Sequence, residues 1–218
     1  MSRYGGADNA GGDRGPGPAS PAGHPPEIPV MDSAQMARTL ARMAHEILEN
    51  NPGERSLAVV GIHTRGAVLG QRLRDLLAQL CGYDVPLGTL DISFYRDDVA
   101  VRGEAWMLPA GKQPQVRGTE LSFGIDGTTI VLVDDVLYTG RTIRAAIDAL
   151  FDYGRPRRIQ LAVLVDRGHR DLPIRPDYVG KNIPTSLPER VSVRVTECDG
   201  TDEVVLVRRA EGTSNDQA

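Results

Sequence analysis

Residues Val131 to Thr142 read Val-Leu-Val-Asp-Asp-Val-Leu-Tyr-Thr-Gly-Arg-Thr, and this stretch decides the fold class of the chain. Ile130 to Val133 form the short aliphatic run that is typical of a strand buried on both faces of a sheet. Apolar residues return at helical spacing over 143–150. The stretch therefore predicts a strand that ends in two carboxylates, then a turn of small residues, then a helix.

The turn between this strand and this helix is suited to binding a phosphate group. Its backbone N–H groups lie at the positive end of the helix dipole, where anions are stabilised. Asp134 and Asp135 would accept hydrogen bonds from vicinal ribose hydroxyls or lie near a hydrated metal ion. An ordinary turn with two solvated acids is the alternative. The residues of the turn are Thr139, Gly140, Arg141 and Thr142.

Composition points to one folded domain between two tails. The chain has 218 residues, enough for one sizeable α/β domain. Residues 1–29 are rich in Gly and Pro and poor in large apolar side chains, so we expect a disordered tail there and another over 211–218. The folded domain is therefore expected over 30–210.

Charge and cysteine content exclude several classes of protein. A net charge of -4 argues against indiscriminate nucleic-acid binding, so any RNA contact must come from a local basic patch. The two cysteines, Cys81 and Cys198, lie far apart and show no metal-ligand spacing. Neither a long apolar run nor a signal peptide is present, and we therefore expect a cytoplasmic protein without a membrane span.

The first predicted element is a helix with a capping box formed by Asp32 and Gln35. Its apolar face carries Met36, Leu40, Met43 and Ile47, and its opposite face carries Arg38, Arg42, His45 and Glu49. Further along the chain, strands are predicted over 56–62, 87–95, 159–165, 191–195 and 204–207, a helix over 67–80, and an irregular segment over 166–186. Such alternation predicts a parallel, doubly wound α/β sheet with ligands at the carboxyl ends of its strands.

A second strand-turn-helix unit places polar residues at another strand end. Thr64, Arg65 and Gly66 directly follow the strand predicted over 56–62. A simple turn with a solvated Arg is the plainer interpretation of these three residues. Their position after a buried strand favours a ligand-binding loop.

The stretch over 96–127 shows no sustained period and contains many Gly and Pro residues. An irregular segment of this length inside a domain is typical of an active-site lid or of a hairpin that orders on binding. Arg96 lies at its mouth, where a cation would approach bound phosphates as the loop closes. Alternatively, Arg96 pairs with Asp97 or Asp98 at the surface.

The strand-turn-helix stretch over 131–142 resembles the 5-phosphoribosyl-1-diphosphate (PRPP) signature of the type I phosphoribosyltransferases. Several other stretches resemble the PyrR branch of that family, whose members are bifunctional pyrimidine operon regulators and uracil phosphoribosyltransferases. The resemblance covers about residues 30 to 207. The stretches are Gly61-Ile-His-Thr-Arg-Gly66, Asp91-Ile-Ser-Phe-Tyr-Arg-Asp-Asp98, Leu164-Val-Asp-Arg-Gly-His-Arg-Asp-Leu-Pro173 and Val179-Gly-Lys-Asn-Ile-Pro-Thr185.

This resemblance implies a type I phosphoribosyltransferase fold, with a mostly parallel doubly wound sheet, a small hood region and a long flexible active-site loop. It implies that the protein makes UMP and diphosphate from uracil and PRPP, with Mg²⁺ bound together with PRPP and without direct protein ligands to the metal. It also implies that UMP or UTP promotes binding to pyrimidine-operon leader mRNA, and that the protein is a homodimer or a higher homo-oligomer. The resemblance implies catalysis by Asp134, Asp135 and Arg96. It implies phosphate and ribose binding by Asp134, Asp135 and residues 139–142, and diphosphate binding by Thr64, Arg65 and Gly66. It also implies uracil binding near Val165, Asp166 and Arg167, and RNA contact by Arg42, His45, Arg170 and Lys181.

Positive charge on the first helix and in the segment over 166–186 gives a weaker argument for RNA that does not depend on the family. A solvated face is the usual meaning of such charge. Ala41 departs from the family, because relatives carry a hydroxyl residue there. Three alternatives therefore stay open: a uracil salvage enzyme without RNA control, a nucleotide-sensing regulator without turnover, and a purine or orotate transferase.

Overall fold

The structure is a computed structural model, and it describes residues 26–53, 55–93 and 118–208. Its main layer is a six-stranded sheet with the strand order β4-β3-β2-β5-β6-β7. All neighbouring strands in it are parallel except β3 and β4, which are antiparallel. These strands are β2 (Leu57–Ile62), β3 (Leu87–Leu90), β4 (Glu120–Leu121), β5 (Thr129–Leu137), β6 (Arg158–Asp166) and β7 (Tyr178–Asn182).

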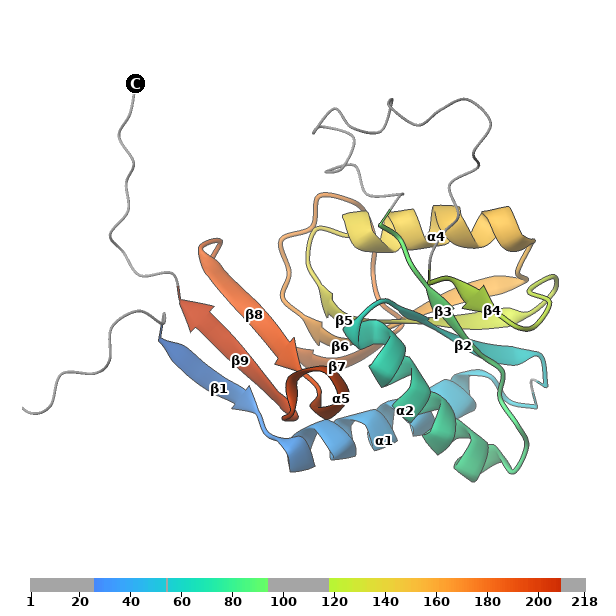
Figure 1. Cartoon of the computed structure of the whole chain (residues 1–218), viewed down its shortest axis with the longest axis horizontal. Coiled ribbons are helices and arrows are strands. Elements are labelled where there is room, and N and C mark those ends of the chain that lie inside the picture. Colours follow the sequence, from blue (N-terminus) through green and yellow to red (C-terminus); the bar gives the residue numbers. More distant parts are fainter. Residues whose placement is uncertain (1–25, 54, 94–117, 209–218) are drawn as a thin grey trace, which may run out of the picture.

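Helices cover both faces of this sheet, as the alternation in the sequence predicted (Figure 1). The helices α1 (Ser33–Asn50) and α2 (Arg65–Cys81) lie on one face, and α4 (Arg141–Tyr153) lies on the other. The central strands are buried on both sides, which explains their unbroken aliphatic composition.

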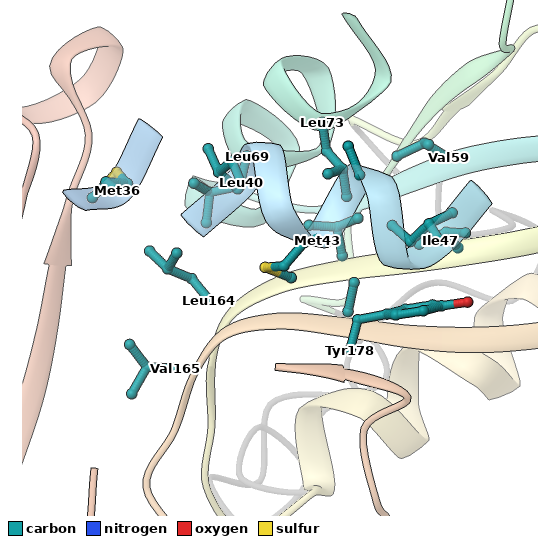
Figure 2. Close-up of a cluster of buried hydrophobic side chains, with 14 of the residues drawn as sticks. Met36, Leu40, Met43, Ile47, Val59, Leu69, Leu73, Leu164, Val165 and Tyr178 are labelled. Carbon is teal, nitrogen blue, oxygen red and sulfur yellow. The ribbon is translucent and has the colours of Figure 1, made fainter. Parts of the chain in front are cut away.

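The predicted capping box of α1 is confirmed. The Asp32 carboxylate accepts from the backbone N–H of Gln35 at 2.7 Å, and the Gln35 side chain accepts from the N–H of Asp32 at 2.9 Å. The predicted apolar face of α1 is buried against α2 and the sheet (Figure 2). All four predicted members, Met36, Leu40, Met43 and Ile47, are buried, and Ala44 is buried beside them. The opposite, charged face therefore stays in solvent.

A second, smaller sheet forms the hood. It contains β1 (Glu27–Met31), β9 (Glu203–Arg208) and β8 (Glu189–Arg194) in that order, with antiparallel pairing throughout. The first and last strands of the described chain are thus neighbours (Figure 1). The short helix α5 (Thr196–Asp199) connects β8 to β9. Because β1 begins at Glu27, the boundary expected at residue 29 lies too late, and the last residues of the predicted tail belong to the hood.

Three predicted element boundaries are wrong. β5 continues through both carboxylates to Leu137, because Val136 and Leu137 still pair with β6. β3 ends at Leu90, since Asp91 accepts hydrogen bonds from the N–H and hydroxyl of Ser93 and so turns the chain out of the ladder. The segment expected to be irregular over 166–186 contains β7, an edge strand.

Several predicted features lie outside the described residues. These are Arg96, residues 96–117 of the lid predicted over 96–127, and the tail residues 1–25 and 209–218. The described end of the lid segment forms β4, which pairs with β3. No helix in the described ranges has the length and apolar character that crossing a membrane requires.

An arginine on α2 links this helix to the hood through hydrogen bonds. Arg72 donates to both carboxylate oxygens of Glu197 at 3.0 and 2.6 Å and to both oxygens of Asp202 at 2.9 and 2.8 Å. We call Glu197, Asp199 and Asp202 the acidic turn. The hydrogen bonds from Arg72 hold the pKa of Glu197 and of Asp202 below the ordinary values.

Acid should weaken this attachment. The lowered pKa values mean that the two carboxylates stabilise the fold above their unfolded-state pKa values, near pH 4, and that this contribution is lost as the pH falls through the lower folded-state values. We expect Arg72→Met to lower the free energy of unfolding by about 1–2 kcal/mol at pH 7. Thermal melts at a series of pH values should show the difference from wild type shrinking below about pH 3. A difference that stays constant with pH would contradict this.

Candidate functional site

A cavity of about 510 Å³ lies beside the carboxyl ends of β2, β3 and β5, where the sequence predicted a ligand site. It brings together five residues that the sequence singled out: Thr64, Arg65, Asp134, Asp135 and Thr142. The rest of its lining consists of Ile62, His63, Asp91, Ile92, Ser93, Gly118 and Val136.

The two acids of β5 form one wall of the cavity. Asp134 is buried and only 6% exposed, and its Oδ1 accepts from the N–H of Asp135 at 2.9 Å. Asp135 is half-buried, and its Oδ1 accepts from the N–H of Val136 at 2.8 Å. Each carboxylate is thus oriented by a backbone hydrogen bond, in the chemistry that suits it to accept from hydroxyl groups of a ligand.

The loop between β2 and α2 forms an adjoining wall, because β2 is the neighbour of β5 in the sheet. The peptide bond between His63 and Thr64 is cis. The His63 ring nitrogen Nε2 lies 2.9 Å from the carbonyl oxygen of Gly118, which joins this loop to the described end of the lid segment. Gly66 is buried in the first turn of α2 and does not line the cavity. The predicted diphosphate loop therefore borders the cavity through Thr64 and Arg65.

Arg65 is paired with a residue of the hood. Its Nε and Nη2 donate to the two carboxylate oxygens of Asp199 at 3.0 and 2.7 Å. This hydrogen bond is the main cause that raises the pKa of Arg65, and the charge of Asp135 acts in the same direction. The guanidinium thus lies between the hood and the acids of β5.

The predicted phosphate loop begins α4, as expected. Gly140 has a φ of +92°, a conformation that favours glycine, and α4 begins at Arg141. Behind the loop, the N–H groups of Asp171 and Leu172 donate to the carbonyl of Thr139 at 3.0 and 3.1 Å. The side chain of Arg141 turns outward to Asp171. The first-turn amides of α4 are therefore suited to binding an anion, and Thr142 is the residue of this loop that lines the cavity.

Sequence reasoning missed the wall formed by His63, Asp91, Ser93 and Gly118. Burial opposes the charge of Asp91, but its hydrogen bonds from Ser93 and the nearby His63 hold the pKa of Asp91 below the ordinary value. The feature of the sequence that points to this wall is the position of Asp91 near the end of a predicted strand.

The three residues predicted near uracil do not line the cavity. Val165 is buried, and the Asp166 carboxylate accepts from the N–H of Gly168 and from Arg170. Arg167 is 7% exposed, and its Cζ lies 4.3 Å from the centroid of the Tyr138 ring. Its guanidinium donates to residues of the segment over 185–189. The side chains of Asp166 and Arg167 therefore hold the loop after β6 in place.

Two of the four predicted RNA residues border a second, shallower depression. We call it the α1–β7 groove, and it has a volume of about 310 Å³. Arg42 lies on its wall and donates to the carbonyls of Val179 and Gly180 at 2.9 and 2.8 Å. Lys181 donates to the carbonyl of Val30 at 2.9 Å. The groove is lined by Met31, Gln35, Arg38, Thr39, Arg42, Gly180 and Lys181.

The other two predicted RNA residues do not line this groove. His45 is exposed on α1. Arg170 pairs with Asp166 at 2.6 Å, donates to the carbonyls of Gly168 and Ile174 in its own loop, and donates to the carbonyl of Tyr138 after β5. Its side chain is only 22% exposed, so the structure gives Arg170 a supporting role in this loop.

Two carboxylates and a glycine turn before a helix, at one edge of a mostly parallel sheet with a hood, fit a phosphoribosyltransferase. The family model for the phosphoribosyl transferase domain matches residues 30–196. Among solved structures, a hypoxanthine-guanine phosphoribosyltransferase from Bacillus anthracis aligns with a TM-score of 0.59 and 19% identity over 83% of this chain and 98% of that chain. The hypoxanthine phosphoribosyltransferase of Trypanosoma cruzi aligns with a TM-score of 0.61 and 18% identity over 83% of this chain and 95% of that chain. These structures confirm the fold class.

Curated relatives define the branch. The chain is 57% identical to the bifunctional protein PyrR of Thermus thermophilus over 83% of this chain and 95% of the relative. It is 54% identical to that of Chloroflexus aurantiacus over 87% of this chain and 98% of the relative. The chain therefore belongs to the phosphoribosyltransferase family, in the group of bifunctional PyrR proteins, as its sequence motifs indicated.

Proposed function

We propose that this protein converts uracil and PRPP to UMP and diphosphate, and that it regulates pyrimidine genes by binding their leader mRNA when UMP or UTP is bound. One observation carries the enzymatic part: a single cavity joins the acids of β5, the loop before α2 and the first turn of α4. The identity to bifunctional PyrR proteins supports the combination of the two activities.

Each wall of the cavity has a role in holding PRPP. The first-turn amides of α4, with Thr142, bind the 5-phosphate at the positive end of the helix dipole. Asp134 and Asp135 accept hydrogen bonds from the two ribose hydroxyls. Thr64 and Arg65 bind the diphosphate on the adjoining wall. The ribose C1 is then held between the acids and the diphosphate loop.

The donors around the cavity fit Mg²⁺ bound with PRPP. Their side chains offer the carboxylate oxygens of Asp91, Asp134 and Asp135 and the hydroxyls of Thr64 and Ser93, and Mg²⁺ prefers oxygen ligands while it keeps several waters. Asp134 and Asp135 are the residues that would hold the hydrated ion. When bound, Mg²⁺ supplies charge neutralisation of the diphosphate.

The chemistry then consists of one exchange at C1. The bond from C1 to the diphosphate oxygen breaks, with its electron pair leaving on the diphosphate, and uracil N1 forms the new bond while its proton is lost to the medium. Positive charge develops on the ribosyl ring between these events, and the Asp135 carboxylate stabilises it. We keep the backbone of 165–167 as the proposed surface for uracil, although these residues do not line the cavity, and we keep Arg96 as a proposed cation for the diphosphate.

A substrate-specificity assay tests this assignment. Purified protein is supplied with PRPP, Mg²⁺ and one base at a time, and nucleotide and diphosphate are both measured. We expect UMP from uracil and far slower reactions with hypoxanthine, guanine or orotate. Faster turnover of a purine base would favour the purine transferase instead, and UMP binding without diphosphate release would indicate a regulator without turnover.

The α1–β7 groove is the surface that we assign to RNA. The guanidinium of Arg42 is 46% exposed although it pairs with Glu46, and Arg38 and Lys181 add two further positive charges. Long basic side chains along a groove position phosphates, while base reading in a hairpin loop supplies specificity. We keep His45 and Arg170 as proposed contacts, with Arg170 acting through the shape of its loop.

We expect Arg42→Ala to weaken binding to the pyrimidine leader RNA about tenfold and to reduce the salt dependence by about one phosphate contact. Filter binding with and without UMP, at several stated salt concentrations, measures both quantities. Arg144→Ala is the matched control, because Arg144 also lies on a helix and pairs with an acid four residues later. It should bind RNA as wild type does.

Two outcomes would redirect the proposal. Equal losses in Arg42→Ala and Arg144→Ala would move the RNA site away from the α1–β7 groove. Weak binding by wild type that does not respond to UMP would leave a uracil salvage enzyme with a solvated basic face. The expected homodimer or higher homo-oligomer can be checked on the same samples by light scattering.

A further inference from the structure

The pair between Arg65 and Asp199 connects the diphosphate loop to the hood. Arg65 is the first residue of α2 and borders the cavity, whereas Asp199 ends α5 between two hood strands. The contact is bidentate, through Nε and Nη2 of the guanidinium. It therefore fixes the plane of the guanidinium as well as its position.

Asp199 is held in place independently of Arg65. Its Oδ2 accepts from the N–H of Val195 at 2.9 Å, and its own N–H donates to the carbonyl of Val195 at 2.7 Å. The same acidic turn is fastened to α2 by Arg72, which binds Glu197 and Asp202. Because Arg72 lies two helical turns after Arg65, one face of α2 carries both attachments.

The side-on geometry leaves one edge of Arg65 available. Asp199 engages Nε and Nη2, and within the described ranges Nη1 has no hydrogen-bond acceptor. Arg65 nevertheless lines the cavity. A guanidinium held by one edge and open at another is suited to donate to a phosphate oxygen without losing rotamer freedom at that moment.

We propose that Asp199 is a positioning residue, which orients Arg65 so that its Nη1 edge binds the diphosphate of PRPP. This proposal rests on the proposed function for its substrate. It assigns the hood a part in binding the leaving group. Asp199 acts through Arg65, and the ribose and 5-phosphate do not depend on it.

The test is calorimetry with three probes: PRPP, inorganic diphosphate and UMP, each in the presence of Mg²⁺. We expect Asp199→Asn to bind PRPP and diphosphate about tenfold more weakly, because one charge-assisted contact loses its orientation. UMP has no diphosphate, so its affinity should stay within about twofold. A structural defect would weaken all three probes together.

Matched variants separate this role from others. Glu197→Gln removes a carboxylate from the same turn, but Arg72 keeps Asp202, so diphosphate affinity should stay close to that of wild type. Asp199→Glu should recover part of the loss. In an Arg65→Ala background, Asp199→Asn should cause no further loss, because the two residues act as one unit.

Several results would overturn the proposal. They are unchanged diphosphate binding in Asp199→Asn, tighter binding, which would make Asp199 a competitor for Arg65, and an equal loss of UMP affinity. A wild-type protein that binds diphosphate but makes no UMP would instead refute the proposed function, so the two failures are distinguishable.

Discussion

Asp135→Asn should lower the turnover of uracil and PRPP to UMP by about a hundredfold, because it removes the negative charge nearest to the developing ribosyl cation. The substitution preserves shape, and the amide oxygen can still accept from the N–H of Val136. We therefore expect the melting temperature to change little. Steady-state kinetics with PRPP as the varied substrate measures the effect, which should fall mainly on kcat.

An exposed carboxylate on α4, outside the cavity, serves as the matched control. Asp148 is exposed and pairs with Arg144, so Asp148→Asn alters a surface charge without touching the cavity. It should turn over uracil as wild type does. Wild-type turnover by Asp135→Asn would refute the assignment of charge stabilisation to this residue.

Gly61→Ala should destabilise the fold by about 3 kcal/mol or more, because the new methyl group has no space. Gly61 lies in the buried strand β2, directly against the start of α2. A Cβ there would lie 2.4 Å from the carbonyl oxygen of Gly66 and 2.5 Å from the Cα of Ala67. Both neighbours are backbone atoms, so the whole first turn of α2 must move.

Denaturant titration measures this cost, and Gly124→Ala is its control. Gly124 has open space around an added Cβ, with no atom within 4 Å. Any Gly61→Ala protein that stays folded should also bind PRPP weakly, because Arg65 moves with α2. A stability equal to that of wild type would mean that β2 and α2 are less closely packed than the structure places them.

The sequence predicted those parts of the molecule that depend on local chemistry. The capping box of Asp32 and Gln35, the buried central strands and the turn before α4 all follow from neighbouring residues, and the structure confirms them. The cavity also contains Asp134 and Asp135 as expected. The carboxyl ends of parallel strands lie at one edge of a sheet, so the sequence pattern was enough to predict that these residues lie close together.

The parts that could not be predicted depend on distant partners. β7 was missed because Gly180 and Lys181 give it a polar pattern, which an edge strand tolerates. Arg167 and Arg170 were predicted to be ligand-binding cations, but Arg167 donates to the segment after β7, and Arg170 pairs with Asp166 and donates to the carbonyl of Tyr138. The pairing of Arg65 with Asp199 joins residues far apart in sequence, and no spacing rule reveals it.

The adjacency of the first and last described strands has a consequence for synthesis on the ribosome. Within the described residues β1 pairs with β9, so β1 stays without this partner until β9, near the end of the described chain, has been translated. The carbonyl of Val30, at the edge of the α1–β7 groove, belongs to that waiting strand. A nascent chain therefore completes the catalytic sheet first, and a stalled or truncated product lacks a finished groove.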